Sequence, residues 1–274
     1  MKPEDKSIIV NGLKLHYLDW GNTKQQTMIL LHGFIAHAHS WDGFAAKMQD
    51  SYHVVALDQR GHGDSDWAQD GAYTAEDFRD DLAAFIDTIE IEKPVIVGHS
   101  MGGRNAIIYA GTYPEKTDRL VAIDSRLRSD PINAMAIQLM ANSILEHLTS
   151  IDEGVEALTK FSPSIPRELA EDLVANGARE LADGSYAPKF DLTMKDQALN
   201  KLLVSDLWPY LEKITCPTLI MRGANSPIMP KDVAKQMVGI LPNGQFSEIE
   251  NAGHLVPQEN HVAFENAVIA FLNS

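Results

Sequence analysis

Apolar residues of this 274-residue chain gather in short runs, separated by longer stretches in which apolar residues recur at helical spacing. A compact apolar run is typical of a strand buried on both faces. Such runs predict strands at residues 27–31, 53–57, 94–97, 120–123, 218–222 and 244–249. The stretches between and after them predict helices at residues 41–48, 75–89, 101–113, 230–238 and 261–272. This alternation predicts a parallel sheet with helices on both faces.

Two segments depart from the alternation. Near the start, residues 7–10 and 13–17 flank Asn11-Gly12, a pair typical of a β-hairpin, which predicts an antiparallel edge. From residue 127 to residue 206 no buried strand is predicted, and helical spacing recurs at residues 134–148, 153–161, 167–181 and 195–203. We therefore expect an α/β core formed by residues 1–126 and 207–274, with residues 127–206 inserted as a helical cap or lid.

A serine follows the strand predicted at residues 94–97, in the pentapeptide Gly98-His99-Ser100-Met101-Gly102. Small residues two positions before and after the serine allow a strand and the next helix to approach closely. A turn this tight would be strained and would hold the hydroxyl above the sheet edge. The plainer alternative is a glycine-rich turn that happens to carry a serine, so the choice depends on partners elsewhere in the chain.

Possible partners lie at the ends of other predicted strands, where ligands of parallel sheets bind. Acyl transfer needs a hydroxyl nucleophile, a base, a carboxylate that orients the base, and N–H donors for the oxyanion. The candidates at strand ends are His32-Gly33-Phe34, Ser100-Met101, Asp124 and His254. These residues can meet each requirement, in the chain order Ser, Asp, His.

Charge and cysteine content narrow the class of partner. A net charge of −15 and a pI near 5.0 argue against a general nucleic-acid binder, because no positive field attracts phosphates. The first six residues are largely charged, no signal segment follows, and no apolar run approaches membrane-spanning length. A single cysteine, Cys216, excludes an internal disulfide. We expect a cytoplasmic protein whose partner is a small molecule, neither nucleic acid nor a membrane, and whose oligomeric state the sequence does not indicate.

The strand-end motifs also resemble those of a known superfamily. The stretches that match the α/β-hydrolase superfamily, in the same order, are Leu31-His32-Gly33-Phe34, Asp58-Gln59-Arg60-Gly61-His62-Gly63-Asp64-Ser65, Gly98-His99-Ser100-Met101-Gly102-Gly103 and Asn251-Ala252-Gly253-His254. The resemblance implies a mostly parallel, eight-stranded twisted sheet with a helical cap insertion. It implies Ser100 as nucleophile, His254 as general base, and the backbone N–H groups of Phe34 and Met101 as oxyanion hole.

The acid departs from the commonest pattern of the superfamily. Most relatives carry it in a Gly-x-x-Asp-Pro context, but residues 223–227 place Ser226 at the aspartate position. A hydroxyl cannot supply the buried negative charge that stabilises an imidazolium. Asp124 is the natural replacement, because it ends the strand after the elbow helix and some superfamily members are similar in placing their acid there. Glu250 and Asp206 are the alternatives, and Asp124 could instead cap a loop or pair with a nearby arginine.

Other residues are candidates for contact with the substrate. His32 and Gly33 lie beside the expected oxyanion hole, although His32 also fits a structural role in its loop. Met135 and Met140 could line a deformable acyl pocket or fill a helical core. Arg126 could bind a substrate carboxylate or pair within its loop. No metal-ligand set is evident, and acyl transfer by these groups requires no cofactor.

The sequence thus predicts a carboxylesterase-like serine hydrolase that cleaves a small ester through an acyl-enzyme intermediate. Hydrolysis of an amide, a lactone or a C–C bond stays open, because the same triad serves all of these reactions. A receptor of the same fold that binds a ligand without turning it over is a further alternative.

Overall fold

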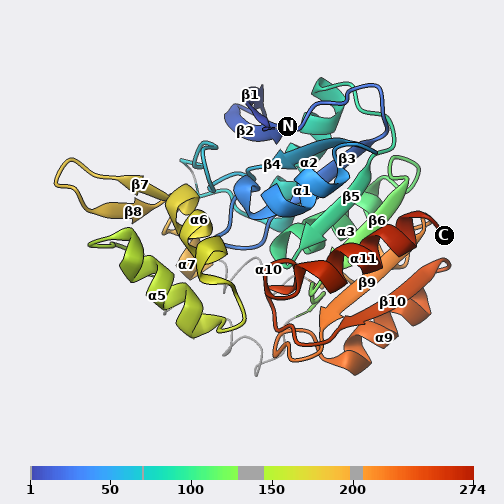
Figure 1. Cartoon of the computed structure of the whole chain (residues 1–274). Helices are drawn as coiled ribbons and strands as arrows, with labels where there is room; N and C mark the ends of the chain where they lie inside the picture. Colours follow the sequence, from blue (N-terminus) through green and yellow to red (C-terminus); the bar gives the residue numbers. More distant parts are fainter. Residues whose placement is uncertain (1, 70, 129–144, 198–205) are drawn as a thin grey trace.

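A single sheet organises the chain (Figure 1). The computed structural model describes residues 2–69, 71–128, 145–197 and 206–274. In these residues eight strands form the sheet, in the order β1 (Glu4–Val10), β2 (Leu13–Asp19), β4 (His53–Leu57), β3 (Thr27–Leu31), β5 (Val95–His99), β6 (Arg119–Ile123), β9 (Thr218–Gly223) and β10 (Gly244–Ile249). The pairs β1–β2 and β2–β4 are antiparallel, and the other neighbouring pairs are parallel. The predicted mostly parallel sheet with an antiparallel edge is confirmed.

Helices cover both faces of this sheet, as predicted (Figure 1). One face packs against α2 (Ala75–Thr88), α3 (Met101–Thr112), α8 (Trp208–Leu211) and α9 (Lys231–Ile240). The other face packs against a 3₁₀ turn, η1 (Ala38–Trp41), and against α1 (Asp42–Met48), α10 (Val256–Glu259) and α11 (His261–Leu272). Successive residues of a strand point to opposite faces. Strand β3 accordingly contributes Ile29 and Leu31 to the first core and Met28 and Leu30 to the second.

Between the strands β6 and β9, the segment at residues 145–197 contains α5 (Ile151–Phe161), α6 (Arg167–Gly177), β7 (Ala178–Glu180), β8 (Tyr186–Pro188) and α7 (Met194–Gln197). The prediction of helices alone is wrong here, because β7 and β8 form an antiparallel hairpin. Helix α6 ends at Gly177, four residues short of the predicted residue 181, because β7 begins at Ala178. Gly184, in the turn between β7 and β8, has a φ of +82°, which favours glycine. This hairpin is short and pairs only with itself among the described strands, so it shows no buried apolar run.

Two further predictions in this segment fall partly outside the described residues. The helix predicted at residues 134–148 is not helical at residues 145–148, where Leu148 instead bridges to Tyr186. Its remaining part lies largely among residues 129–144, which the structure does not describe. The helix predicted at residues 195–203 begins as α7, and residues 198–205 are likewise not described. Among the described helices, none is both long and apolar enough to cross a membrane.

Candidate active site

Ser100 lies at the sharp turn between β5 and α3. Its φ of 51° and ψ of −112° are unfavourable for a residue with a side chain, so the turn stores strain. Two glycines make the turn possible: a Cβ on Gly98 would lie 2.5 Å from the Gly102 carbonyl oxygen, and a Cβ on Gly102 would overlap the Leu31 carbonyl oxygen. The predicted elbow geometry is therefore present, and it leaves the Ser100 side chain half-buried at the carboxyl end of the sheet.

His254 joins Ser100 to Asp124 through both ring nitrogens. The Ser100 hydroxyl lies 3.0 Å from His254 Nε2, and His254 Nδ1 lies 2.6 Å from Asp124 Oδ2. With Nδ1–H donating to the carboxylate, Nε2 is free to accept the serine proton. Asp124 directly follows β6 and His254 directly precedes the short turn that leads into α10, so three separate segments meet here. Asp124 is completely buried, and His254 is 7% exposed.

The environment of Asp124 accounts for the serine at the usual acid position. Ser226 Oγ donates a hydrogen bond of 2.5 Å to Asp124 Oδ2, and the Gly223 N–H donates one of 3.3 Å to Oδ1. The backbone N–H groups of Ile228 and Met229 both bond to Ser226 Oγ, which directs the hydroxyl proton toward the carboxylate. Ser226, just after the end of β9, therefore forms a hydrogen bond to the carboxylate of Asp124, which follows the neighbouring strand β6.

The alternative acids lie away from this cluster. Glu250 and Asp206 are both exposed, and Asp206 accepts a hydrogen bond from the Trp208 N–H. Arg126, the alternative partner of Asp124, donates from Nε to the Arg128 carbonyl oxygen at 2.7 Å.

The residues expected to supply the oxyanion donors are Met101, which follows Ser100 in the chain, and Phe34. Met101 is the first residue of α3, where backbone N–H groups have no acceptor within the helix. Phe34 follows β3 and lines the same cavity as Ser100. The Met101 side chain packs in a small apolar cluster that also contacts Phe34. Phe34 and Met101 therefore pack in the same cluster near Ser100, and the role of their N–H groups as oxyanion donors stays a prediction.

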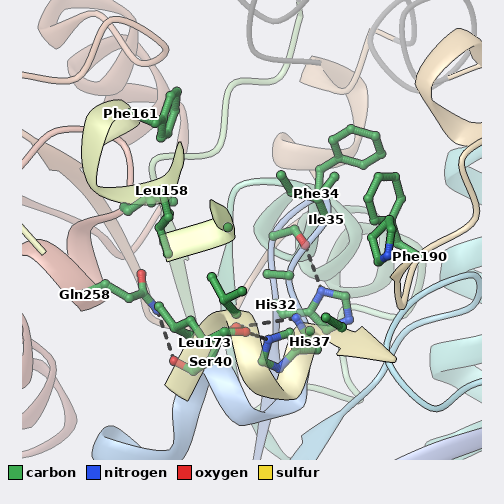
Figure 2. Close-up of a pocket in the computed structure, with 18 of the residues that line it drawn as sticks. His32, Phe34, Ile35, His37, Ser40, Leu158, Phe161, Leu173, Phe190 and Gln258 are labelled. Carbon is green, nitrogen blue, oxygen red and sulfur yellow. Dashed lines mark hydrogen bonds between the residues drawn. The ribbon is translucent and has the colours of Figure 1, made fainter. Parts of the chain in front are cut away.

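A cavity of about 260 Å³ opens beside Ser100 and His254 (Figure 2). Its wall is largely apolar and includes Leu158 and Phe161 from α5, Leu173 from α6, and Phe190. None of the described lining residues is Lys, Arg, Asp or Glu. The cavity therefore suits an apolar group and offers no fixed charge to bind a carboxylate.

Two of the histidines in the wall have structural partners for their ring nitrogens. His32 Nδ1 donates to the Gly33 carbonyl oxygen at 2.8 Å, and its Nε2 accepts from the Gln59 N–H at 3.0 Å. His99 Nε2 donates to the His254 carbonyl oxygen at 2.8 Å. Burial lowers the pKa of His32 and of His99 to about 3, so both rings stay neutral near pH 7. His32 thus adopts the structural role that the sequence left open, although it also lines the cavity.

The remaining predicted contacts divide into three groups. Gly33 lines the cavity, where a Cβ would lie 2.8 Å from His99 Nδ1. Arg126 is not among the described residues of the cavity wall. Met135 and Met140 lie outside the described residues.

Sequence reasoning missed one polar residue at this site. Gln258 lines the cavity together with His37, and nothing in the sequence marks Gln258 beyond its position four residues after His254. A possible metal-ligand group lies elsewhere: His16, Asp58 and Asp64 offer atoms within 4.8 Å of one another. His16 Nδ1 is already bonded to Asp58 Oδ2 at 2.7 Å, and these residues do not line the cavity.

A mostly parallel sheet that presents a serine at a strand-to-helix turn, with aspartate and histidine at neighbouring strand ends, is the arrangement of an α/β-hydrolase. A sequence model described as the alpha/beta hydrolase fold matches residues 26–260, and the chain belongs to this family.

Several known hydrolases are similar to this chain. A 2-(acetamidomethylene)succinate hydrolase of Mesorhizobium japonicum is 28% identical over 250 residues, which are 90% of this chain and 88% of the relative. A 2-hydroxy-6-oxononadienedioate/2-hydroxy-6-oxononatrienedioate hydrolase of Paraburkholderia phymatum is 27% identical, covering 95% and 91% of the two chains. The crystal structure of E-2-(acetamidomethylene)succinate hydrolase superposes with a TM-score of 0.92 at 25% identity, over 99% of this chain and 100% of that one. The chain is a hydrolase of small-molecule substrates.

Proposed function

We propose that this hydrolase cleaves a small carboxylic ester through an acyl-enzyme intermediate on Ser100. The observation that carries the proposal is the chain of hydrogen bonds from Ser100 through His254 to the buried Asp124, at the wall of an apolar cavity. A receptor that only binds a ligand has no use for a strained serine held against a histidine base, so this arrangement favours turnover.

In the proposed mechanism, Ser100 Oγ attacks the ester carbonyl while His254 Nε2 takes its proton. The N–H groups of Phe34 and Met101 bind the oxyanion, and each such donor contributes about 3 kcal/mol to transition-state stabilisation in comparable hydrolases. Asp124 holds the imidazole in the tautomer that accepts at Nε2 and stabilises the imidazolium. His254 then protonates the leaving alcohol and activates water, which releases the acid and restores Ser100.

The composition of the cavity wall favours an ester over the substrates for which the similar enzymes are named. Those names denote a succinate derivative and dioates, which carry two carboxylates. The described wall here offers no lysine or arginine to bind a carboxylate. Hydrolysis of an amide or a C–C bond is the second candidate, because these relatives use the same fold and the triad chemistry is shared.

We further propose that residues 127–206 act as a cap over the site. Helices α5 and α6, which lie in this interval, contribute Leu158, Phe161, Leu173 and Val174 to the cavity wall. A cap of this kind excludes water from the acyl-enzyme and limits the size of the acyl group.

Turnover of short p-nitrophenyl esters by the native protein and by the Ser100→Ala variant tests the proposed function. We expect the variant to lose almost all of the activity of the native protein. Equal turnover by the two proteins would refute it. A panel of amides and 1,3-diketones, assayed in parallel, tests the second candidate.

A further inference from the structure

The wall of the apolar cavity carries three buried polar atoms that have no hydrogen-bond partner among the described residues: Gln258 Oε1, His37 Nδ1 and Trp41 Nε1. Gln258 Oε1 forms no hydrogen bond in the described structure, although the side chain is only 7% exposed. The amide orientation is determined by its other end, because the atom 3.0 Å from the Ser40 carbonyl oxygen must be a donor and is therefore Nε2. Figure 2 shows the Gln258 oxygen pointing away from Ser40 and toward Leu158, which also lines the cavity.

A second buried acceptor lies on the other side of Ser40. His37 Nε2 lies 2.9 Å from the Leu173 carbonyl oxygen, so it carries the ring proton and donates. Burial lowers the pKa of His37, which keeps the ring neutral and leaves Nδ1 as an acceptor. Among the described residues His37 Nδ1 has no hydrogen-bond partner, and the nearby Ser40 N–H bonds instead to the His37 carbonyl oxygen at 3.0 Å.

Gln258 Oε1 and His37 Nδ1 are acceptors, whereas Trp41 Nε1–H is a donor. A buried acceptor without a partner is unfavourable, so such atoms in native proteins have a ligand or water as donor. Only an O–H or N–H group complements an acceptor. The described wall has no charged side chain to accompany an ammonium or a carboxylate, so the donor belongs to a neutral molecule.

The size of the cavity restricts the ligand further. Its volume of about 260 Å³ lies just below the range that is typical of pockets for drug-sized ligands. Much of the rest of the wall, including Leu158, Phe161 and Leu173, offers apolar contact. A ligand that fits is therefore small and mostly hydrocarbon, with a polar group in addition to the scissile ester.

Building on the proposed function, we propose that the substrate is a small neutral ester whose apolar part carries a hydroxyl or amide N–H group, and that Gln258 Oε1 selects it. Gln258 is a specificity-determining residue in this account, and His37 Nδ1 is a second free acceptor among the described residues of the same wall.

Matched pairs of methyl esters test this selection. Each pair has the same chain length and ends in either a hydroxyl or a methyl group, so the two members differ little in volume. A purely apolar cavity disfavours the hydroxyl. We expect the native protein to show a kcat/KM about 5- to 10-fold higher for the hydroxylated member at one chain length, as one added hydrogen bond allows.

Two substitutions distinguish the acceptor Oε1 of Gln258 from the hydrogen bond that Nε2 donates to Ser40. Gln258→Met removes the acceptor and the donor, and we expect the ratio of kcat/KM for the hydroxylated member to that for the methyl member to fall at least 10-fold. Gln258→Glu loses the donor to Ser40 but keeps an acceptor, and we expect the preference for the hydroxyl to persist. Leu158→Ala is a control on the cavity wall. It should change kcat/KM for both esters of a pair by the same factor and leave the ratio of the two values unchanged.

Binding without turnover keeps this test independent of the proposed function. The dissociation constants of the same pairs for the Ser100→Ala variant, measured by calorimetry, should favour the hydroxylated member, and adding Gln258→Met should abolish the preference. The proposed selection would be overturned if the native protein showed no higher kcat/KM for the hydroxylated member than for the methyl member at any chain length. It would also be overturned if Gln258→Met kept the native ratio of these two values. Selective binding with no ester hydrolysis by the native protein would instead overturn only the proposed function.

Discussion

Replacing Asp124 with asparagine removes the carboxylate from the hydrogen-bond chain while keeping its volume. Asp124 is completely buried, and its Oδ2 accepts from His254 Nδ1 at 2.6 Å. An amide NH₂ group facing His254 requires Nδ1 to accept, which moves the ring proton to Nε2, where it blocks proton transfer from Ser100. We expect kcat for ester hydrolysis to fall about 10⁴-fold, as for the same change in a known triad, which corresponds to about 5.5 kcal/mol.

Ser226→Ala is the milder change at the same carboxylate. It removes one hydrogen bond to a charged group, which is worth about 1.5–3 kcal/mol. Asp124 keeps its bonds to His254 and to the Gly223 N–H, so part of the support remains. We therefore expect a loss of about 10-fold in kcat, far smaller than the loss in Asp124→Asn.

The double variant Asp124→Asn/Ser226→Asp tests whether the acid can move between the two strands. Ser226 Oγ lies 2.5 Å from Asp124 Oδ2, so a carboxylate introduced there approaches the same histidine. We expect it to recover at least 10-fold over Asp124→Asn, measured as steady-state hydrolysis of p-nitrophenyl acetate. Activity of Asp124→Asn within fivefold of the native protein would refute the assignment of Asp124 as the acid.

Three further predictions concern stability. Ser100→Gly should unfold with a free energy about 1 kcal/mol higher than Ser100→Ala in urea titrations, because only glycine relieves the strain at a φ of 51°; equal values would contradict this. The unfolding free energy of Gly102→Ala should be lower than that of the native protein by more than about 3 kcal/mol, because the added Cβ overlaps the Leu31 carbonyl oxygen; a lower melting temperature would show this loss. Burial lowers the pKa of His32 and His99 to about 3 and of His62 to about 4, so only the unfolded chain binds these protons near pH 5. The unfolding free energy should fall by about 2 kcal/mol per ring from pH 7.5 to pH 5, and a flat profile would contradict the burial.

The core of the fold was predictable because each buried strand is a compact apolar run in the sequence. Strand β3, for example, has no polar residue after Thr27, which indicates burial on both faces. The elbow was predictable for a similar reason, since both glycines lie two residues from Ser100 in the sequence; Gly98 is required by its contact with the Gly102 backbone, and Gly102 by its contact with the Leu31 backbone. Local constraints of this kind are legible in a single sequence.

Features that depend on distant contacts were not predictable. The hairpin of β7 and β8 is too short for a periodic pattern, and its pairing with Leu148 brings together separate segments. The free acceptor of Gln258 follows from a bond to Ser40, which lies 218 residues earlier in the chain. Likewise, Ser226 marked the absence of the usual acid, but its bond to Asp124 depends on the packing of β6 against β9.

Covalent labelling of Ser100 tests the central claim most directly. A fluorophosphonate reacts with a serine only when a base and an oxyanion hole activate it. Intact-mass measurement of the native protein, followed by peptide mapping, should give one adduct on Ser100 and a parallel loss of ester hydrolysis, and the Ser100→Ala variant should stay unlabelled. Ester hydrolysis that persists in fully labelled protein, or an unmodified Ser100 after prolonged treatment, would contradict the account.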